Sequence, residues 1–193
     1  RAAAPEHLAA RGAHASGRGQ AVRGVLVHAH GARHDAAPHV RDARDLERAL
    51  TFAQWDERAC RLGNALLGLG LAKGDRVAVL AYNCVEWLEI YAATAKAGLI
   101  VVPINFRLAG PEVAFIVENA EARALIVQDE LCHLVEQVQG RLPVAAGSIV
   151  HFGKAACPAG WQDYEGLIAA GSGSEPGQKV ALGDPWTLMY TSG

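Results

Sequence analysis

From Thr51 onward, amphipathic segments alternate with short runs of apolar residues along the chain. The amphipathic segments repeat apolar residues at spacings of three and four, which predicts helices with one buried face. The apolar runs hold four or five residues each and predict strands that are buried on both faces. Their strict alternation predicts an α/β fold, a mainly parallel sheet with helices on both faces. The predicted strands are residues 77–80, 99–102, 124–127, 148–152 and 186–190.

Local signals mark the ends of the predicted helices. Thr51 and Gln54 have the spacing of a capping box at the start of the first helix, and Asn83 with Glu86 repeats that spacing before the second. Asp129 is the expected cap of the helix that follows the third strand. The other expected boundaries are helix ends at Gly68, Gly70, Gly98 and Gly140, a strand end at Pro103 and a first helical turn at Pro111.

The second predicted helix separates apolar from acidic positions. Its expected inward residues are Val85, Leu88, Tyr91, Ala92 and Ala95. Glu86 and Glu89 then fall on a solvated face. We do not expect these two carboxylates to act as an acid–base pair, because that chemistry needs pKa values shifted by burial or by a charged neighbour.

Residues 1–49 differ in composition from everything that follows. They contain six of the eight histidines and eight arginines, but no Lys, Asn, Thr, Ile, Phe, Tyr or Trp. Their only apolar cluster, residues 25–27, is too small for a core. Three interpretations stay open for this atypical segment: a disordered basic arm, a stretch translated out of frame from GC-rich DNA, or a metal-binding histidine tract at His28, His30 and His34.

The composition of the chain narrows the functional classes. Of its 193 residues, 51% are hydrophobic and 20% charged, so residues 50–193 can form one domain or a large piece of one. The net charge of -2 does not indicate a nucleic-acid partner, and no apolar run is long enough for a transmembrane segment. The four cysteines are scattered without a C-x-x-C pair, which predicts free thiols in a reducing cytoplasm and no metal site.

The end of the chain carries the candidate binding residues. A Gly/Ser-rich stretch, residues 170–177, is expected to form a flexible surface connection to the last strand, which runs directly into Thr191, Ser192 and Gly193. Glycine lets the backbone approach an anion, successive amides form an anion-binding nest, and hydroxyls add donors. Ligands of open α/β sheets bind beyond the carboxyl ends of the strands. Ordinary turns use the same residue types, so the tripeptide alone is a weak signal.

Several segments, taken in order, resemble the adenylate-forming acyl-CoA synthetases. They are Thr-Phe-Ala-Gln-Trp from Thr51, Gly-Asp-Arg-Val-Ala from Gly74, Gly-Leu-Ile-Val-Val-Pro-Ile-Asn-Phe-Arg-Leu from Gly98, Asp-Pro from Asp184 and Leu-Met-Tyr-Thr-Ser-Gly from Leu188. That family has a phosphate loop of the form Tyr-Thr-Ser-Gly-Thr-Thr-Gly-x-Pro-Lys-Gly, and Tyr190 to Gly193 match its first four residues. The resemblance covers residues 50–193 and does not reach residues 1–49.

The resemblance implies a two-step, ATP-dependent ligation. A small-molecule carboxylic acid, fatty or aryl, attacks the α-phosphate of ATP, and the thiol of coenzyme A then displaces AMP from the acyl-adenylate. By the same resemblance, Thr191 and Ser192 offer hydroxyl and amide donors to the triphosphate, whose charge Mg²⁺ shares, and Gly193 allows close approach. The loop lysine, the adenine-binding segment, the Mg²⁺-binding Glu and the domain with the catalytic Lys have no counterpart here. We therefore assign no catalytic and no metal-binding residue and expect this polypeptide alone to be inactive.

Two alternatives stay open. The chain could be a stand-alone flavodoxin-like or Rossmann-like nucleotide-binding module, although no G-x-G-x-x-G follows the first strand, where Ala81-Tyr82-Asn83-Cys84 stands. It could also be the non-functional product of a truncated gene.

Overall fold

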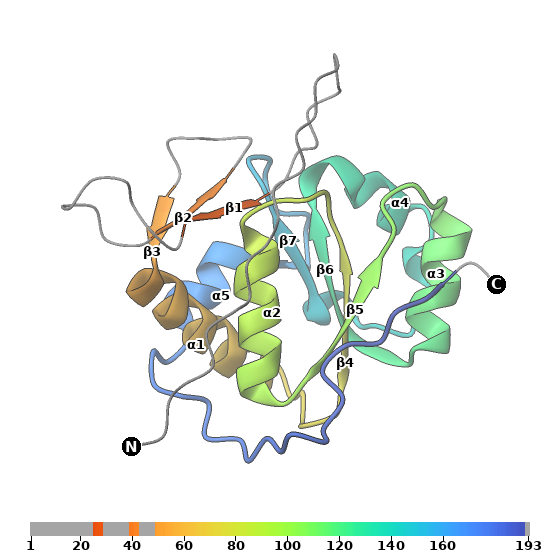
Figure 1. Ribbon diagram of the computed structural model, residues 1–193. Helices are drawn as coiled ribbons and strands as arrows, with labels where there is room; N and C mark the ends of the chain where they lie inside the picture. Colours follow the sequence, from red (N-terminus) through yellow and green to blue (C-terminus); the bar gives the residue numbers. More distant parts are fainter. Residues whose placement is uncertain (1–24, 29–38, 43–48, 192–193) are drawn as a thin grey trace, which may run out of the picture.

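A five-stranded parallel sheet occupies the centre of the computed structural model, which describes residues 25–28, 39–42 and 49–191 (Figure 1). The strands lie in the order β5-β4-β6-β7-β8, and every pairing between neighbours is parallel. Their bounds are β4 Arg76–Leu80, β5 Ile100–Ile104, β6 Ala122–Gln128, β7 Ile149–Phe152 and β8 Gln162–Asp163. The predicted fold class, a parallel sheet with helices on both faces, is confirmed.

Helices cover both faces of this sheet (Figure 1). One face carries α1 Phe52–Gly68, α2 Glu86–Ala97 and α5 Tyr164–Ala170, and the other carries α3 Gly110–Asn119 and α4 Cys132–Glu136. Along β4, Val77 and Val79 pack into the first layer of helices, whereas Ala78 and Leu80 pack into the second. A strand buried on both faces must be apolar at every position, which is why the short apolar runs were visible in the sequence.

The first helix begins as its sequence predicts. Thr51 is the N-cap of α1, its hydroxyl oxygen accepts the backbone N–H of Gln54, and the Gln54 side chain accepts the backbone N–H of Thr51. This reciprocal capping box satisfies two of the amides that a helix start leaves without intrahelical partners.

The second helix differs from its prediction at its start and on its buried face. It begins at Glu86, with Val85 at the N-cap position and no side-chain capping bond, so the predicted cap at Asn83 is wrong. The buried residues of the helix are Glu86, Glu89, Ile90, Ala93, Thr94 and Ala97, so the predicted solvated glutamates are wrong. Of the predicted inward residues Val85 is buried, whereas the other four are only partly buried. Apolar periodicity misses this face because three of its members are polar.

Two further boundaries differ because of tertiary contacts. Pro103 lies inside β5 rather than ending it, and an edge strand tolerates a proline that cannot donate to a ladder. Asp129 caps no helix: its carboxylate accepts amides from the loop after β7, and a 3₁₀ turn, Asp129–Leu131, precedes the short α4. A second 3₁₀ turn, Gln139–Arg141, replaces the rest of the predicted helix.

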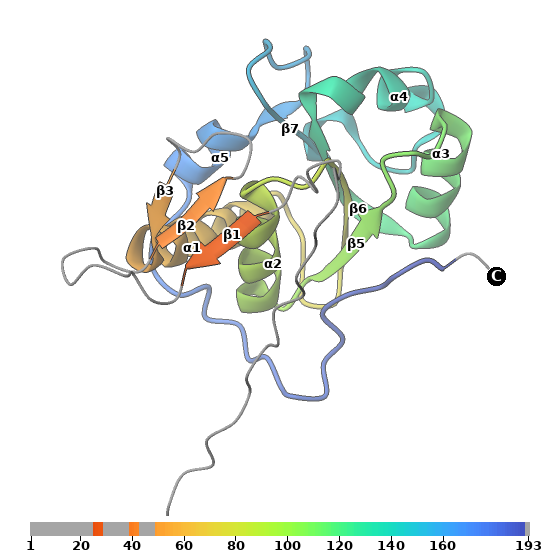
Figure 2. The ribbon, with the colours of Figure 1, turned by 45° about the horizontal axis from the view of Figure 1, so that its top comes forward.

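A small antiparallel sheet precedes α1 and lies next to it, on the same side as α2 and α5 (Figure 2). Its strands, in order, are β1 Val25–His28, β2 His39–Asp42 and β3 Ala49–Thr51. Two of them fall in the predicted atypical segment, whose boundary at residue 49 stays a prediction. His30 and His34 of the possible metal-binding tract lie outside the described residues. Among those that are described, no helix combines the length and the hydrophobicity that a membrane crossing requires.

Candidate functional site

Residues 185–191 run beside β5 at the edge of the parallel sheet. The amide of Val101 donates to the carbonyl of Trp186 over 3.0 Å, and the amide of Leu188 donates to the carbonyl of Val101 over 2.9 Å. These two bonds form a single parallel bridge between Val101 and Thr187, so the predicted strand at residues 186–190 is wrong. The next bond of such a ladder would need an amide from Pro103, which has none.

Side chains anchor this segment at both of its ends. The Trp186 ring packs against Tyr91 of α2, with 5.6 Å between the ring centroids. The Tyr190 hydroxyl donates to Asn119 Oδ1 at the end of α3 over 2.6 Å. Sequence reasoning missed the Asn119–Tyr190 bond, because no local pattern pairs residues 71 positions apart. Thr191 is exposed and lies beside Pro103 and Asn105, at the carboxyl end of β5.

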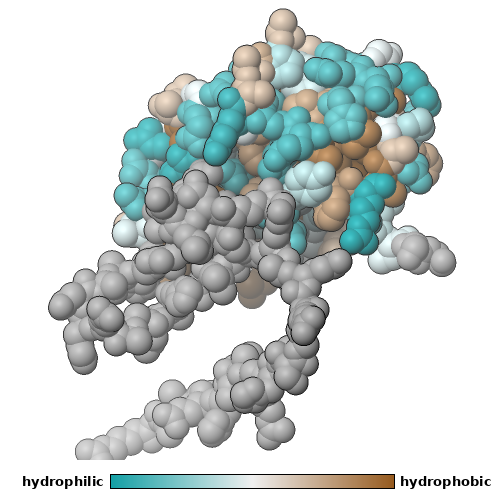
Figure 3. Space-filling model, turned by 90° about the horizontal axis from the view of Figure 1, so that it is seen from above, coloured by the Kyte–Doolittle hydropathy of each residue, from teal (hydrophilic) through white to brown (hydrophobic). Residues whose placement is uncertain are grey.

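Thr191 is the one candidate binding residue that the structure describes. It lies in a hollow of about 770 Å³ beside β5 and α3, whose walls include Pro111, Phe115 and Tyr190. Ser192 and Gly193 lie outside the described residues, so the predicted phosphate-binding role of the tripeptide stays a prediction. Seen from above, the carboxyl side of the sheet exposes apolar surface between polar side chains (Figure 3).

A second hollow, of about 510 Å³, lies on the α2 side of the same segment. Four aromatic rings line it: Trp87 and Tyr91 of α2, Phe106 of the loop after β5, and Tyr190. Arg107, which follows β5, lies with its guanidinium 5.6 Å from the centroid of the Phe106 ring. The segment that carries Thr191 thus separates two hollows at the carboxyl edge of the sheet.

Buried charge joins three helices on the face of α1, α2 and α5. Glu89 is fully buried, and its carboxylate accepts from Arg58 over 2.7 Å and from the Tyr164 hydroxyl over 2.8 Å. Burial and the neighbouring Glu89 carboxylate raise the pKa of Tyr164, so the phenol stays a neutral donor. Burial alone would lower the pKa of Arg58, but hydrogen bonds to Glu165 and Glu89 hold it above its ordinary value. The group has no free proton acceptor and is therefore structural.

A third hollow, of about 740 Å³, lies beyond the carboxyl ends of β6 and β7. Its walls carry five carboxylates and two cationic side chains: Glu86, Asp129, Glu130, Asp163 and Glu165, with Arg58 and Lys154. An excess of negative charge disfavours a phosphate ligand here.

Asp129 organises the loop at the rim of this hollow. Its carboxylate meets Nε2 of the buried His151 and accepts the amides of Lys154 and Ala155, the latter over 2.8 Å. Partial burial by itself raises the pKa of Asp129, but these hydrogen bonds outweigh it and lower the pKa below its ordinary value. His151 thus lies in a structural contact.

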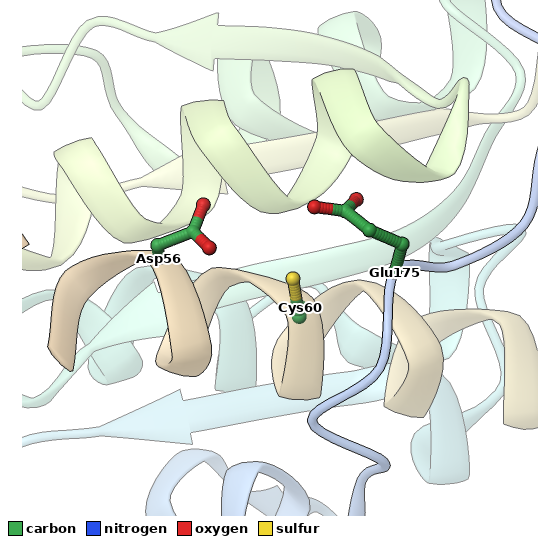
Figure 4. Close-up of side chains that lie close together, drawn as sticks. All are labelled: Asp56, Cys60 and Glu175. Carbon is green, nitrogen blue, oxygen red and sulfur yellow. The ribbon is translucent and has the colours of Figure 1, made fainter. Parts of the chain in front are cut away.

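One cluster in the part of the chain with described side chains has the composition of a metal site. Asp56 and Cys60 project from α1 towards Glu175 (Figure 4), and their ligand atoms lie within 4.8 Å of one another. The ammonium group of Lys96, however, lies 2.9 Å from the Asp56 carboxylate and 2.6 Å from that of Glu175. A cation of the protein itself therefore neutralises this cluster. All four cysteines are free thiols.

Comparison with known proteins adds a consistent set of similarities. A family model described as AMP-binding enzyme matches residues 27–193. A feruloyl-CoA synthase of Amycolatopsis is 36% identical over 157 residues, which cover 81% of this chain and 28% of that protein. A long-chain-fatty-acid–CoA ligase of Mycobacterium tuberculosis is 31% identical over 144 residues, covering 75% of this chain and 27% of the ligase.

A solved structure shows the same arrangement of strands and helices. The crystal structure of an anthranilate CoA ligase in complex with anthranoyl-AMP superposes with a TM-score of 0.71 and 32% identity, over 76% of this chain and 28% of that one. The chain thus spans less than a third of the length of the relatives named above.

Proposed function

Because the chain belongs to the AMP-binding enzyme family, we propose that it forms part of an ATP-dependent acid–CoA ligase. The reaction joins a small-molecule carboxylic acid to the thiol of coenzyme A through an acyl-adenylate. The relatives named above are ligases or synthases of aryl and long-chain fatty acids, which supports a carboxylic acid of one of these two kinds as the substrate. The free thiols agree with the predicted cytoplasmic location.

One observation carries this proposal: Thr191 lies beside Pro103 and Asn105, at the carboxyl end of β5, where open α/β folds bind their ligands. The segment before Thr191 is hydrogen-bonded to Val101 of β5 and to Asn119 of α3, which holds Thr191 in place. Thr191, Ser192 and Gly193 would then donate amide and hydroxyl hydrogen bonds to the phosphates of ATP. Negative charge builds on these phosphates during transfer, so fixed donors and Mg²⁺ stabilise the transition state.

Two clusters of charged side chains among the described residues are already neutralised by cations of the protein itself. Arg58 neutralises the buried Glu89. Lys96 neutralises the cluster of Asp56, Cys60 and Glu175. We therefore expect these 193 residues to supply part of the phosphate site and none of the acid–base groups. The alternative of a stand-alone Rossmann-like module has less support, since the family match extends over residues 27–193.

Nuclear magnetic resonance of the ¹⁵N-labelled chain tests the proposed phosphate contact. Addition of Mg·ATP is expected to shift the amide resonances of Thr191, Ser192 and Gly193, with weak affinity because the rest of the site is not in this chain. Shifts confined to the acid-lined hollow at Asp129, or to the aromatic hollow at Phe106, would place the nucleotide elsewhere and refute the assignment.

A further inference from the structure

Residues 171–184, which we call the strap, connect α5 to the segment that carries Thr191. The strap first binds α1: Arg61 donates to the carbonyl of Gly171 over 3.0 Å, and the Asn64 amide donates to the carbonyls of Ser172 and Ser174 over 2.8 and 2.7 Å. Only glycine fits at position 171, because a Cβ there would lie 2.1 Å from the Arg61 carbonyl oxygen. The predicted surface connection is thus exposed, yet its backbone is hydrogen-bonded to the helix beneath it.

The strap next binds α2 through Lys96. Figure 4 shows Glu175 of the strap facing Asp56 and Cys60 of α1. The Lys96 ammonium bridges Glu175 and Asp56, and only 22% of the Lys96 side chain is exposed. The hydrogen bond from Lys96 to Glu175 raises the pKa of Lys96, so the bridge stays charged at neutral pH. One cation therefore joins α1, α2 and the strap.

The end of the strap binds Lys73, which lies between α1 and β4. The Lys73 ammonium donates to the carbonyl of Lys179 over 2.7 Å and pairs with the Asp184 carboxylate over 2.6 Å. Asp184 also accepts the amide of Ala181 over 2.7 Å, which closes the turn before Pro185. The strap is thus fixed at both ends and in its middle.

Beyond the strap, the segment that leads to Thr191 has few contacts of its own. It makes one bridge with β5, and Trp186 and Met189 leave 54% and 68% of their surface exposed. A segment with two backbone hydrogen bonds and little burial opens easily unless its ends are held. The strap holds the upstream end, and the Asn119–Tyr190 bond holds the downstream end.

We propose that Lys96 is a positioning residue for the segment at residues 185–191, acting through the strap. This inference rests on the proposed function only for what Thr191 binds. The ion pairs of Lys96 fix where the strap leaves the helices, and this sets where the following segment meets β5. Partly exposed ion pairs weaken as the salt concentration rises, so the position of this segment should also depend on ionic strength.

The test compares Lys96→Met, Lys96→Arg and Lys154→Met by amide hydrogen exchange. Lys96→Met is expected to speed exchange of the Leu188 amide about five- to tenfold, because the ion pair that joins Lys96 to the strap at Glu175 is lost. Amides of β4 should keep their rates. Lys96→Arg keeps a cation in place and should restore protection, and Lys154→Met removes an exposed lysine away from the strap and should change nothing.

A second readout separates positioning from support of the fold. In a titration with pyrophosphate, Lys96→Met should raise several-fold the pyrophosphate concentration at which the Thr191 amide resonance has moved halfway to its bound position. Unchanged exchange at Leu188, or equal acceleration throughout β4, overturns the inference. Should Lys96→Met fail to fold, Glu175→Gln removes only the strap side of the bridge and is judged by the same criterion. If the Thr191 resonance of the wild-type chain does not shift with pyrophosphate, the phosphate site is refuted. The exchange rate of the Leu188 amide still decides the role of Lys96.

Discussion

Among single residues, Glu89 shows how a buried charge is accommodated in this fold. Its carboxylate is fully buried but accepts hydrogen bonds from Arg58 and Tyr164. A buried charge is tolerated only when its partners are close and well oriented. The two partners lie 31 and 75 positions away in the sequence, so no local pattern could reveal that this glutamate faces inward.

Removing this carboxylate is expected to cost more than removing an exposed one. Glu89→Ala should lower the free energy of unfolding by about 3 kcal/mol, because Arg58 and Tyr164 lose a buried acceptor. Glu57→Ala is the matched control: Glu57 also pairs with an arginine, Arg61, but is mostly exposed, so its loss should cost about 0.5 kcal/mol or less. Urea denaturation of both variants measures the difference, and equal losses would contradict this account of the network.

The carboxylate of Asp129 predicts how stability depends on pH. Its pKa in the folded chain lies below the ordinary value of 3.8, so the charged form stabilises the fold above that pH. This stabilisation is lost as the pH falls through 3.8 towards the folded pKa. The stability difference between the wild type and Asp129→Asn should therefore be largest near neutral pH and shrink in acid. Parallel stability curves from pH 3 to pH 7 would show that Asp129 is not the titrating group.

At the scale of elements, β5 and α2 show which boundaries the sequence encodes locally. The end of α2 was predictable, since Gly98 adopts a left-handed conformation with φ of 66°, which glycine adopts without strain. The start of α2 was not, because Val85 provides no side-chain cap and the packing of Glu86 and Glu89 determines it. The predicted strand at residues 186–190 does not form for a reason that is visible in the sequence, because Pro103 has no amide hydrogen to donate.

Glycine at the end of α2 should resist substitution. In Gly98→Ala the alanine backbone must adopt a left-handed conformation, and its Cβ would lie 3.0 Å from Cγ of Lys73. We expect a loss of about 1–2 kcal/mol in unfolding free energy. Gly68→Ala is the control, because Gly68 is the last residue of α1 and a Cβ there would meet no atom within 4 Å. This substitution should leave the unfolding free energy unchanged or raise it slightly. Thermal or urea denaturation that ranks the two variants in the opposite order would contradict the role given to Gly98.

For the whole molecule, the alternation of apolar runs and amphipathic helices was sufficient to predict the parallel sheet. Strands that are buried on both faces leave a clear pattern, and the structure has the five strands in parallel. The site was harder to predict, because its geometry depends on the strap and on the Asn119–Tyr190 bond, which join residues distant in sequence. The family could be predicted only from the resemblance to acyl-CoA synthetases. Thr191 lies beside Pro103 and Asn105, at the carboxyl end of β5.

The family assignment also predicts what this chain does not do alone. ATP–pyrophosphate exchange with fatty and aryl acids should stay at the level of the buffer, because the chain spans less than a third of the length of the ligases it resembles. The assay needs a related full-length ligase as its positive control. Acid-dependent exchange by the purified chain would show that these residues suffice for adenylation.

We propose above all that residues 191–193 bind the phosphates of ATP. The most direct test is a comparison of ATP, pyrophosphate and adenosine, each added to the ¹⁵N-labelled chain with Mg²⁺. We predict that ATP and pyrophosphate shift the amides of Thr191, Ser192 and Gly193, and that adenosine leaves them unchanged. Equal shifts with adenosine, or unchanged amides at these three residues while others respond to ATP, would contradict the claim.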